Sequence, residues 1–291
     1  MATEREIRRR VRSVKNIQQV TKAQQTISAS KMRRAQTAVL ASRPYEERLR
    51  TVLNDLAPYA DVEAHPLLVR RPVRRSLIVL ITTDRGFVGA LNTNMVRAAL
   101  RHAEALPATS WVSVGRKGAG QLRRFRRDTV AEFSGLGDRP TSADTMAISA
   151  VLQEEFLSGR VDEVFLAFTR FVNTMRQEPA LRRILPLAPE EALGGPRGAE
   201  PPGRLQYIFE PDPETVLGAV LPRLIEVTVY QVVLENIASE HSARLIAMRN
   251  ATDAAADLIE ELTLAANKAR QWRITKEMLE IASGAEALSK G

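Results

Sequence analysis

The C-terminal quarter of the chain carries the longest uninterrupted helical pattern. Between Asp212 and Gly284 the only interior helix breakers are Gly218 and Pro222. Asp212 can accept hydrogen bonds from the free N–H groups of a first turn, and Pro213 suits the first helical position because its missing N–H would have no partner there. Gly284 can adopt the left-handed conformation that often ends a helix. The pattern therefore predicts one helix over this whole range.

Apolar and small residues recur along this helix at alternating spacings of four and three, the repeat of a coiled-coil seam. The seam comprises Leu234, Ala238, His241, Leu245, Met248, Thr252, Ala255, Ile259, Leu262, Ala266 and Ala269. At 1.5 Å per residue the helix would be roughly 100 Å long, too long to be buried in one compact domain. We therefore expect a partner helix along its length, supplied by the other end of the chain.

Residues 3–57 are predicted to form this partner helix. Its apolar positions follow helical spacing and are Ile7, Val11, Val14, Ile17, Val20 and Ile27. A separate basic stripe contains Arg5, Arg8, Arg12 and Lys15. The helix is therefore expected to be apolar on one side and basic on another. Pro44 is expected to kink or divide it, because proline removes a backbone donor and clashes one turn back.

Between the two helices the pattern changes to short apolar, β-branched runs. The first, residues 76–81, is typical of a parallel strand buried on both faces. Further strands are predicted at 111–114, 129–133, 161–171 and 181–187, with helices at 90–106 and 143–157. Strands alternating with helices predict an α/β layer with a mostly parallel sheet.

Glycine and proline cluster in residues 189–204, which predicts a loop before a short apolar run at 205–209. The expected segments are an N-terminal coiled-coil helix (1–58), an α/β domain (75–190), a connecting segment (191–209) and a C-terminal coiled-coil helix (210–291). The two terminal helices can pair antiparallel only if the α/β domain sits at one end of the pair.

Composition narrows the class of protein. The apolar share of 44% is enough for a packed core, and the absence of cysteine excludes disulfides and zinc–thiolate sites. No run of 18 apolar residues occurs, so we expect no membrane span. The N-terminus lacks an apolar signal core, so we expect a cytoplasmic location.

The net charge of +8 is concentrated at one end, because residues 1–50 hold 13 Lys/Arg against 4 Asp/Glu, a balance of +9. This asymmetry has three interpretations. The basic stretch 5–15 can be a solvated helix face, a nucleic-acid-binding face, or a face that contacts acidic loops of a surrounding protein. Stacking aromatics are missing near it, which weighs against nucleic acid.

Candidate chemistry is sparse. The turn Asp84–Gly89 follows a strand and precedes a helix, the correct context for nucleotide binding, but it lacks both phosphate-binding glycine patterns, as does the turn 115–118. The three histidines lie in different elements, and His241 falls on the seam, where a core or interface histidine is expected rather than a base. We expect no catalytic residue, no metal and no cofactor.

Several longer sequence strings, spread along the chain, point to the same protein family. They are Ser13-Val14-Lys15-Asn16, Thr21-Lys22-Ala23, Ser30-Lys31-Met32-Arg33, Arg43-Pro44-Tyr45, Asp84-Arg85-Gly86 with Gly89 and Leu91-Asn92, Phe209-Glu210-Pro211, Glu235-Asn236-Ile237-Ala238-Ser239-Glu240-His241, Met248-Arg249-Asn250-Ala251-Thr252-Asp253 and Asn267-Lys268-Ala269-Arg270-Gln271 with Ile274-Thr275. Over nearly the whole chain this sequence resembles the gamma subunit of F-type ATP synthases.

The resemblance implies a central rotor shaft. In that family the two long helices form an antiparallel coiled coil inside a ring of three alpha and three beta subunits. A Rossmann-like α/β domain lies outside the ring, beside the epsilon subunit and the membrane c-ring. Nucleotide binding and catalysis belong to alpha and beta, so the resemblance implies a non-catalytic subunit, peripheral to the cytoplasmic face of a bacterial membrane.

The resemblance also implies contact residues. Arg270, Gln271 and Thr275 match positions that contact a beta-subunit loop, and Tyr207 and Glu210 match the foot that meets the c-ring. The basic face of Arg8, Arg12 and Lys15 would touch acidic loops of the surrounding ring.

Some positions depart from the family pattern. They are Gln24-Gln25-Thr26 in place of methionine-rich apolar residues, Val88 in place of a common cysteine, and Trp272 and Arg273 in place of smaller residues. Two rival hypotheses remain: a basic coiled-coil nucleic-acid-binding protein, which the charge alone supports, and an enzyme of the α/β domain.

Overall fold

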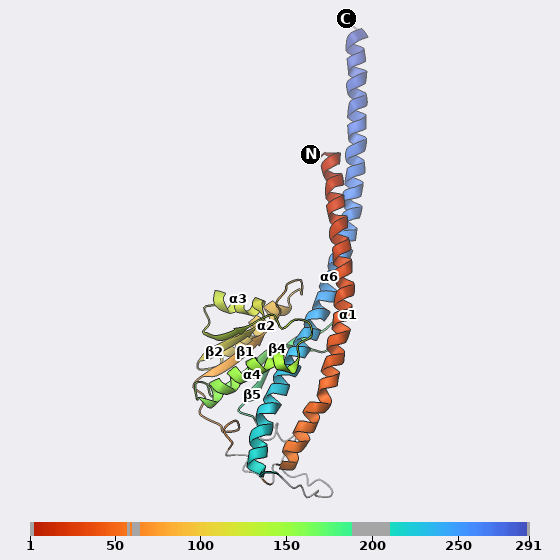
Figure 1. Ribbon diagram of the computed structural model, residues 1–291. Coiled ribbons are helices and arrows are strands. Elements are labelled where there is room, and N and C mark those ends of the chain that lie inside the picture. The colour runs from red at the N-terminus through yellow and green to blue at the C-terminus, as the bar shows by residue number, and fades with distance from the viewer. Residues whose placement is uncertain (1–2, 57–58, 60–64, 188–209, 290–291) are drawn as a thin grey trace. The chain divides into compact units, whose positions relative to one another are not determined.

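A computed structural model describes residues 3–56, 59, 65–187 and 210–289 (Figure 1). The chain divides into two compact units, one made of residues 1–28 and 245–291 and the other of residues 29–244. Two long helices, α1 (Glu4–Leu56) and α6 (Pro213–Ser289), contribute to both units. The predicted Gly/Pro-rich loop and the apolar run 205–209 lie outside the described residues.

The first unit is an antiparallel pair of helix segments. The Thr21 hydroxyl of α1 lies 2.8 Å from the Thr252 hydroxyl of α6, and the Arg273 guanidinium of α6 lies 3.2 Å from the Glu4 carboxylate at the start of α1. Residues later in α1 therefore contact residues earlier in α6, as in an antiparallel pair. The predicted pairing of the two chain ends is confirmed in this unit.

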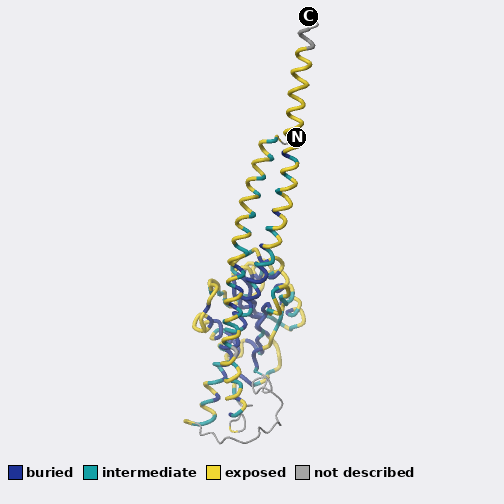
Figure 2. The backbone as a smooth tube through the Cα atoms, turned by 90° about the vertical axis from the view of Figure 1, so that its right-hand side faces the viewer, coloured by how far each residue is buried: buried dark blue, intermediate teal, exposed yellow. Residues whose placement is uncertain are grey.

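The predicted seam of α6 is also confirmed within this unit. Its members, spaced alternately by three and four, are buried or half-buried: Leu245, Met248, Thr252, Ala255, Ile259, Leu262, Ala266 and Ala269. Most positions between them are exposed, so teal and yellow alternate along this part of the helix in Figure 2. Small residues at the seam allow close approach of the two helices.

The predicted apolar stripe of α1 is correct only in its first half. Ile7, Val11 and Val14 are half-buried. Further on, Ile17, Val20 and Ile27 are 54%, 67% and 45% exposed, so their assignment to the packed face is wrong. The seam positions there are polar, and all of them are buried or half-buried: Gln18, Thr21, Gln25 and Ser28. The seam keeps the three–four spacing set by Ile7 and Val14, and the larger apolar residues fall one position away from it.

The second unit is built on a five-stranded sheet of order β3-β2-β1-β4-β5, in which all pairs are parallel except β4–β5. The strands are β1 (Ser76–Ile81), β2 (Thr109–Val114), β3 (Thr129–Phe133), β4 (Glu163–Phe171) and β5 (Gln177–Leu185). All six residues of β1 are buried, as expected for a parallel strand covered on both faces. The predicted α/β layer with a mostly parallel sheet is confirmed.

The two faces of the sheet are covered differently. Helices α2 (Leu91–Glu104) and α3 (Arg116–Arg124) cover one face, where Ile78 and Leu80 join their core. The alternate residues of β1 face the other side, where α4 (Ser142–Leu157) and the segments of α1 and α6 that belong to this unit supply the core. The long helices are thus part of the hydrophobic core of this unit.

The helices differ from the sequence-based expectations at three places. The nine-residue helix α3 was not predicted, because its basic sequence shows only three buried residues, Gly118, Ala119 and Leu122. Of the two outcomes expected at Pro44, division of α1 does not occur: the helix continues to Leu56, and Ser42 and Tyr45 on either side of the proline accept hydrogen bonds from α6 side chains. Gly284 does not end α6, because the following alanines and leucine are strong helix formers.

An 18-residue window of α6 is long and apolar enough to cross a membrane by composition, with a mean hydropathy of 1.5, although no continuous apolar run occurs. Half of this window is buried inside the chain. Leu217, Leu221, Leu224 and Ile225 of α6 belong to the core of the second unit. We therefore interpret this part of α6 as a core helix.

Candidate functional site

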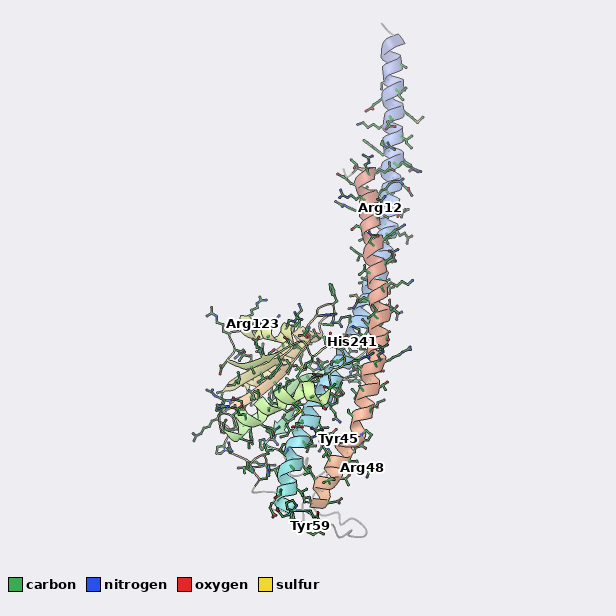
Figure 3. All side chains as sticks on the ribbon, viewed as in Figure 1. Arg12, Tyr45, Arg48, Tyr59, Arg123 and His241 are labelled. Carbon is green, nitrogen blue, oxygen red and sulfur yellow. The ribbon has the colours of Figure 1, made fainter. Side chains whose placement is uncertain are left out.

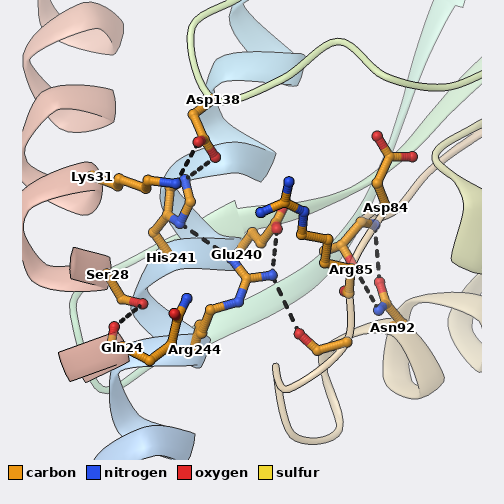
Figure 4. Close-up of polar contacts among 12 residues, drawn as sticks. Gln24, Ser28, Lys31, Asp84, Arg85, Asn92, Asp138, Glu240, His241 and Arg244 are labelled. Atoms are coloured by element: carbon orange, nitrogen blue, oxygen red, sulfur yellow. Dashed lines mark hydrogen bonds and ion pairs between the residues drawn. The ribbon is translucent and has the colours of Figure 1, made fainter. Parts of the chain in front are cut away.

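A polar cluster of the second unit joins both long helices to the loops at the carboxyl ends of the parallel strands (Figure 4). His241 of α6 is 1% exposed, and its Nε2 lies 3.0 Å from Oδ1 of Asp138 in the loop after β3. The other carboxylate oxygen of Asp138 accepts a 2.6 Å hydrogen bond from Nζ of Lys31 in α1. The Asp138 carboxylate thus bridges the two helices.

The second ring nitrogen of His241 has its own neighbour. Its Nδ1 lies 3.3 Å from Nη1 of Arg244. Burial lowers the pKa of His241 to about 4, so the ring is neutral at physiological pH. A guanidinium can only donate, so the neutral ring accepts at Nδ1 from Arg244 and carries its proton on Nε2, the nitrogen nearest to Asp138.

Arg244 extends the cluster to the loop after β1. Its Nη2 donates to the Glu240 carboxylate at 2.6 Å and lies 3.3 Å from the carbonyl oxygen of Gly86. Burial raises the pKa of Glu240, and the neighbouring Arg244 opposes this shift. With His241 neutral, the two cations of the cluster, Lys31 and Arg244, balance its two carboxylates, Asp138 and Glu240. The cluster therefore fixes loops to helices.

The start of α3 shows how the glycine-containing turns are used. The Asp84 carboxylate accepts hydrogen bonds from the backbone N–H of Arg116 at 3.0 Å and of Gly135 at 2.8 Å. The Thr82 hydroxyl accepts from the N–H of Gly118 at 2.8 Å, and a Cβ at Gly118 would stand only 2.7 Å from that oxygen. Side chains of the chain itself thus occupy the donors that a phosphate would need.

An open pocket of about 290 Å³ lies between the loop 86–89 and helices α2 and α3. Its only titratable lining residue is Lys117. Across the part of the chain that the structure describes, no three His, Asp or Glu side chains are grouped to hold a metal ion. These features supply no acid–base pair and no ligand set.

The chain matches the family model described as ATP synthase over residues 3–288. It is 48% identical over 294 residues to the ATP synthase gamma chain of Dehalococcoides mccartyi, covering 99% of this chain and 100% of the relative. The chain belongs to the ATP synthase gamma chain family. The gamma chain of Roseiflexus castenholzii is 47% identical over 297 residues and covers both chains completely.

Solved structures share the gamma-chain fold at lower identity. A chain of the Euglena gracilis mitochondrial ATP synthase, in a structure described as OSCP/F1/c-ring, aligns with a TM-score of 0.69 at 22% identity, covering 98% of this chain and 94% of that one. A chain from the central stalk and c-ring of the Tetrahymena thermophila enzyme gives 0.62 at 24% identity, covering 80% and 99%.

None of the residues that the family resemblance selects is a member of the polar cluster. Arg8, Arg12 and Lys15 are exposed on α1, where Arg12 is labelled in Figure 3, and Arg8 pairs with Glu4 at 2.8 Å. Further residues are exposed on α6 or just before it: Arg270, Gln271, Thr275 and Glu210. Tyr207 lies outside the described residues.

Sequence reasoning missed most of the polar cluster. Of its members it singled out only His241, from its seam position. The partners Lys31 and Asp138 come from distant parts of the chain, and only the folded sheet brings the loop after β3 to the helices. The one available signal was a histidine at a seam position in a chain with few histidines.

Proposed function

We propose that this chain is the central rotor shaft of an F-type ATP synthase, transmitting torque between proton flow through a c-ring and ATP synthesis or hydrolysis on a ring of alpha and beta subunits. The observation that carries this function is the first unit. Here two antiparallel helix segments meet along a seam of small residues, and α6 continues past its contact with Glu4 as an exposed helix.

The exposed end of α6 indicates a partner that surrounds it. Every described side chain from Arg270 to Ala285 is exposed. Large apolar side chains are prominent among them: Trp272 (62%), Ile274 (45%), Met278 (65%), Leu279 (63%) and Ile281 (72%). Such a concentration of exposed apolar area marks an interaction surface. A ring of three alpha and three beta subunits would cover it.

The resemblance to the gamma family supports proposals for specific contacts. Arg270, Gln271 and Thr275 contact a loop of a beta subunit. Tyr207 and Glu210 form the foot on the c-ring, beside the epsilon subunit. Arg8, Arg12 and Lys15 face acidic loops of the surrounding ring. The protein is peripheral to the cytoplasmic face of the membrane.

The shaft has no nucleotide site or cofactor of its own. The filled donors at the start of α3 and the balanced charges around His241 support this part of the proposal. The nucleic-acid alternative is not favoured, since the gamma-chain match spans almost the whole sequence.

The absence of cysteine allows a direct test of rotation. Thr93 is exposed on α2, so Thr93→Cys provides one labelling site in the α/β domain. The labelled chain is assembled with the alpha and beta subunits from the same organism, and the ring is immobilised. We expect the probe to rotate in one direction when ATP is added. A probe that stays fixed while the complex hydrolyses ATP would overturn the rotor function.

A further inference from the structure

Arginines line the edge of the sheet where the parallel strands begin. Arg74 and Arg75 immediately precede β1, and Arg126 and Arg127 precede β3. β2 lies between these strands: the Ser76 N–H donates to the Ala108 carbonyl oxygen, and the Trp111 N–H donates to the Asp128 carbonyl oxygen. Neighbouring strands lie about 4.8 Å apart, so the four arginines form a row of roughly 10 Å across three strand starts. We call this row the arginine edge.

The arginine edge is open to partners. All four arginines are exposed, and in the described residues none has a side-chain ion pair with a carboxylate. Two apolar side chains lie beside them in the sequence, Val73 at 41% and Phe125 at 48% exposed. The edge therefore offers both charge and apolar contact.

The carboxylates along this edge are already engaged by the fold. Asp162 accepts hydrogen bonds from the backbone N–H groups of Arg74 at 2.7 Å and Arg75 at 3.0 Å. Asp128 accepts from the Ser110 hydroxyl at 3.2 Å. These acids are held by backbone and hydroxyl donors. The charge of Arg74 also helps to lower the pKa of Asp162, but no direct ion pair joins their side chains in the described residues, so the guanidinium donors can bind a ligand.

The backbone after α3 fixes the second pair of arginines. Arg126 has a φ of 51°, a left-handed conformation uncommon for a residue with a Cβ. Two hydrogen bonds hold it there, from the Arg126 N–H to the Arg123 carbonyl oxygen and from the Arg127 N–H to the Leu122 carbonyl oxygen, both 3.0 Å. The turn is therefore well defined. Arg123 is labelled at this end of the domain in Figure 3.

We propose that the arginine edge is a docking site for an acidic segment of another protein subunit, which crosses the starts of β3, β2 and β1 and places carboxylates on the four guanidinium groups. Guanidinium groups bind carboxylates through paired, charge-assisted hydrogen bonds. The Asp128 and Asp162 carboxylates between the arginines would repel a uniformly anionic membrane surface. A protein segment can place its acids beside the arginines alone and its apolar residues on Val73 and Phe125.

Zero-length cross-linking tests the site. Arg74→Lys, Arg75→Lys and Arg127→Lys preserve the charge and add amines that a carbodiimide couples to carboxylates in direct contact. The complex is purified through a tag on this chain, so the test does not depend on its motor activity. We expect coupled peptides that join these positions to Asp or Glu residues of another subunit. The matched control, Arg97→Lys with Arg101→Lys, places amines on exposed positions of α2 and should give no such peptide.

Charge reversal provides the second measurement. With Arg74→Glu, Arg75→Glu and Arg127→Glu, we expect about tenfold weaker retention of the coupled subunit at moderate salt, against no change for Arg97→Glu with Arg101→Glu. The proposal is overturned if coupling joins these positions only to Asp128 or Asp162 of the same chain, or if retention is unchanged. It is equally overturned if the reversal removes binding to vesicles containing anionic phospholipid while subunit retention stays normal. Failure of the rotation experiment would leave these outcomes unaffected.

Discussion

His241 shows how one residue acquires its properties from groups that are remote in sequence. Its seam position predicts a buried side chain, and it is buried. The charged groups around it come from four elements: Lys31 on α1, Asp84 and Arg85 in the loop after β1, Asp138 in the loop after β3, and Glu240 and Arg244 on α6. Burial outweighs the attraction of Asp138 and keeps the ring neutral.

This environment predicts a specific pH dependence of stability. The pKa of His241 is about 4 in the folded chain, against an ordinary value of 6.5. Below pH 6.5 the unfolded chain binds a proton that the folded chain does not, so the free energy of unfolding falls as the pH drops towards 4. The loss attributable to this group reaches about 3 kcal/mol once both states are protonated.

The matched variant is His241→Gln, because a glutamine amide can donate to Asp138 and accept from Arg244 without titrating. Chemical denaturation of the isolated chain at several pH values between neutral and about 4 provides the measurement. We expect the variant to lose less stability than the wild type over this interval. Equal losses of stability in the two proteins would show that protonation of His241 does not contribute to the pH dependence.

At the scale of elements, the sequence predicted the pairing of the long helices better than the face by which α1 pairs. Seam positions on α6 could be chosen by the alternating spacing of three and four alone, since its small and its apolar residues both follow that spacing. On α1 the choice followed hydrophobicity, which selected Ile17, Val20 and Ile27. The structure instead places the half-buried Thr21 against Thr252 and leaves those three residues exposed. Where a seam is polar, spacing predicts better than hydrophobicity.

Seam packing predicts the effect of a larger side chain on α6. Ala266 is 4% exposed, so Ala266→Leu would force the helices apart and lower the free energy of unfolding by about 1–3 kcal/mol. Ala256 is exposed on the same helix and serves as the control, since Ala256→Leu should change stability by less than about 0.5 kcal/mol. Thermal unfolding of the isolated chain measures both. Equal unfolding midpoints for the two variants would show that Ala266 does not pack in the seam.

At the scale of the whole molecule, the strands were predictable because parallel strands buried on both faces appear as continuous apolar runs. Helix α3 escaped detection because it buries one narrow stripe and exposes basic residues elsewhere. The arginine edge also escaped detection. Its arginines are separated along the chain, and only the parallel register of β1, β2 and β3 places them in one row. Surfaces assembled by sheet order cannot be seen in local sequence patterns.

The exposed end of α6 permits a prediction that separates folding from function. Arg270 and Gln271 are exposed beyond the last buried seam residues, so replacing them in the isolated chain should change its stability by less than about 0.5 kcal/mol. Inside the proposed ring, Arg270 would form paired, charge-assisted hydrogen bonds with a beta-subunit carboxylate, and Gln271 would add a neutral one. Such contacts must form and break as the shaft turns, so they affect turnover more than assembly.

We therefore expect Arg270→Ala with Gln271→Ala to leave the chain folded and the complex assembled at normal yield, while ATP hydrolysis per complex falls by about tenfold or more, the effect of losing one charge-assisted contact in the rate-limiting state. Lys268→Ala is the control, since Lys268 is exposed on the same helix and lies outside the predicted contact. Arg270→Lys should recover only part of the activity, because an ammonium group keeps the charge but not the paired geometry. Normal activity in an assembled double variant would show that both residues are ordinary surface positions, and an equal loss for Lys268→Ala would show that the charge of this segment matters rather than a specific contact.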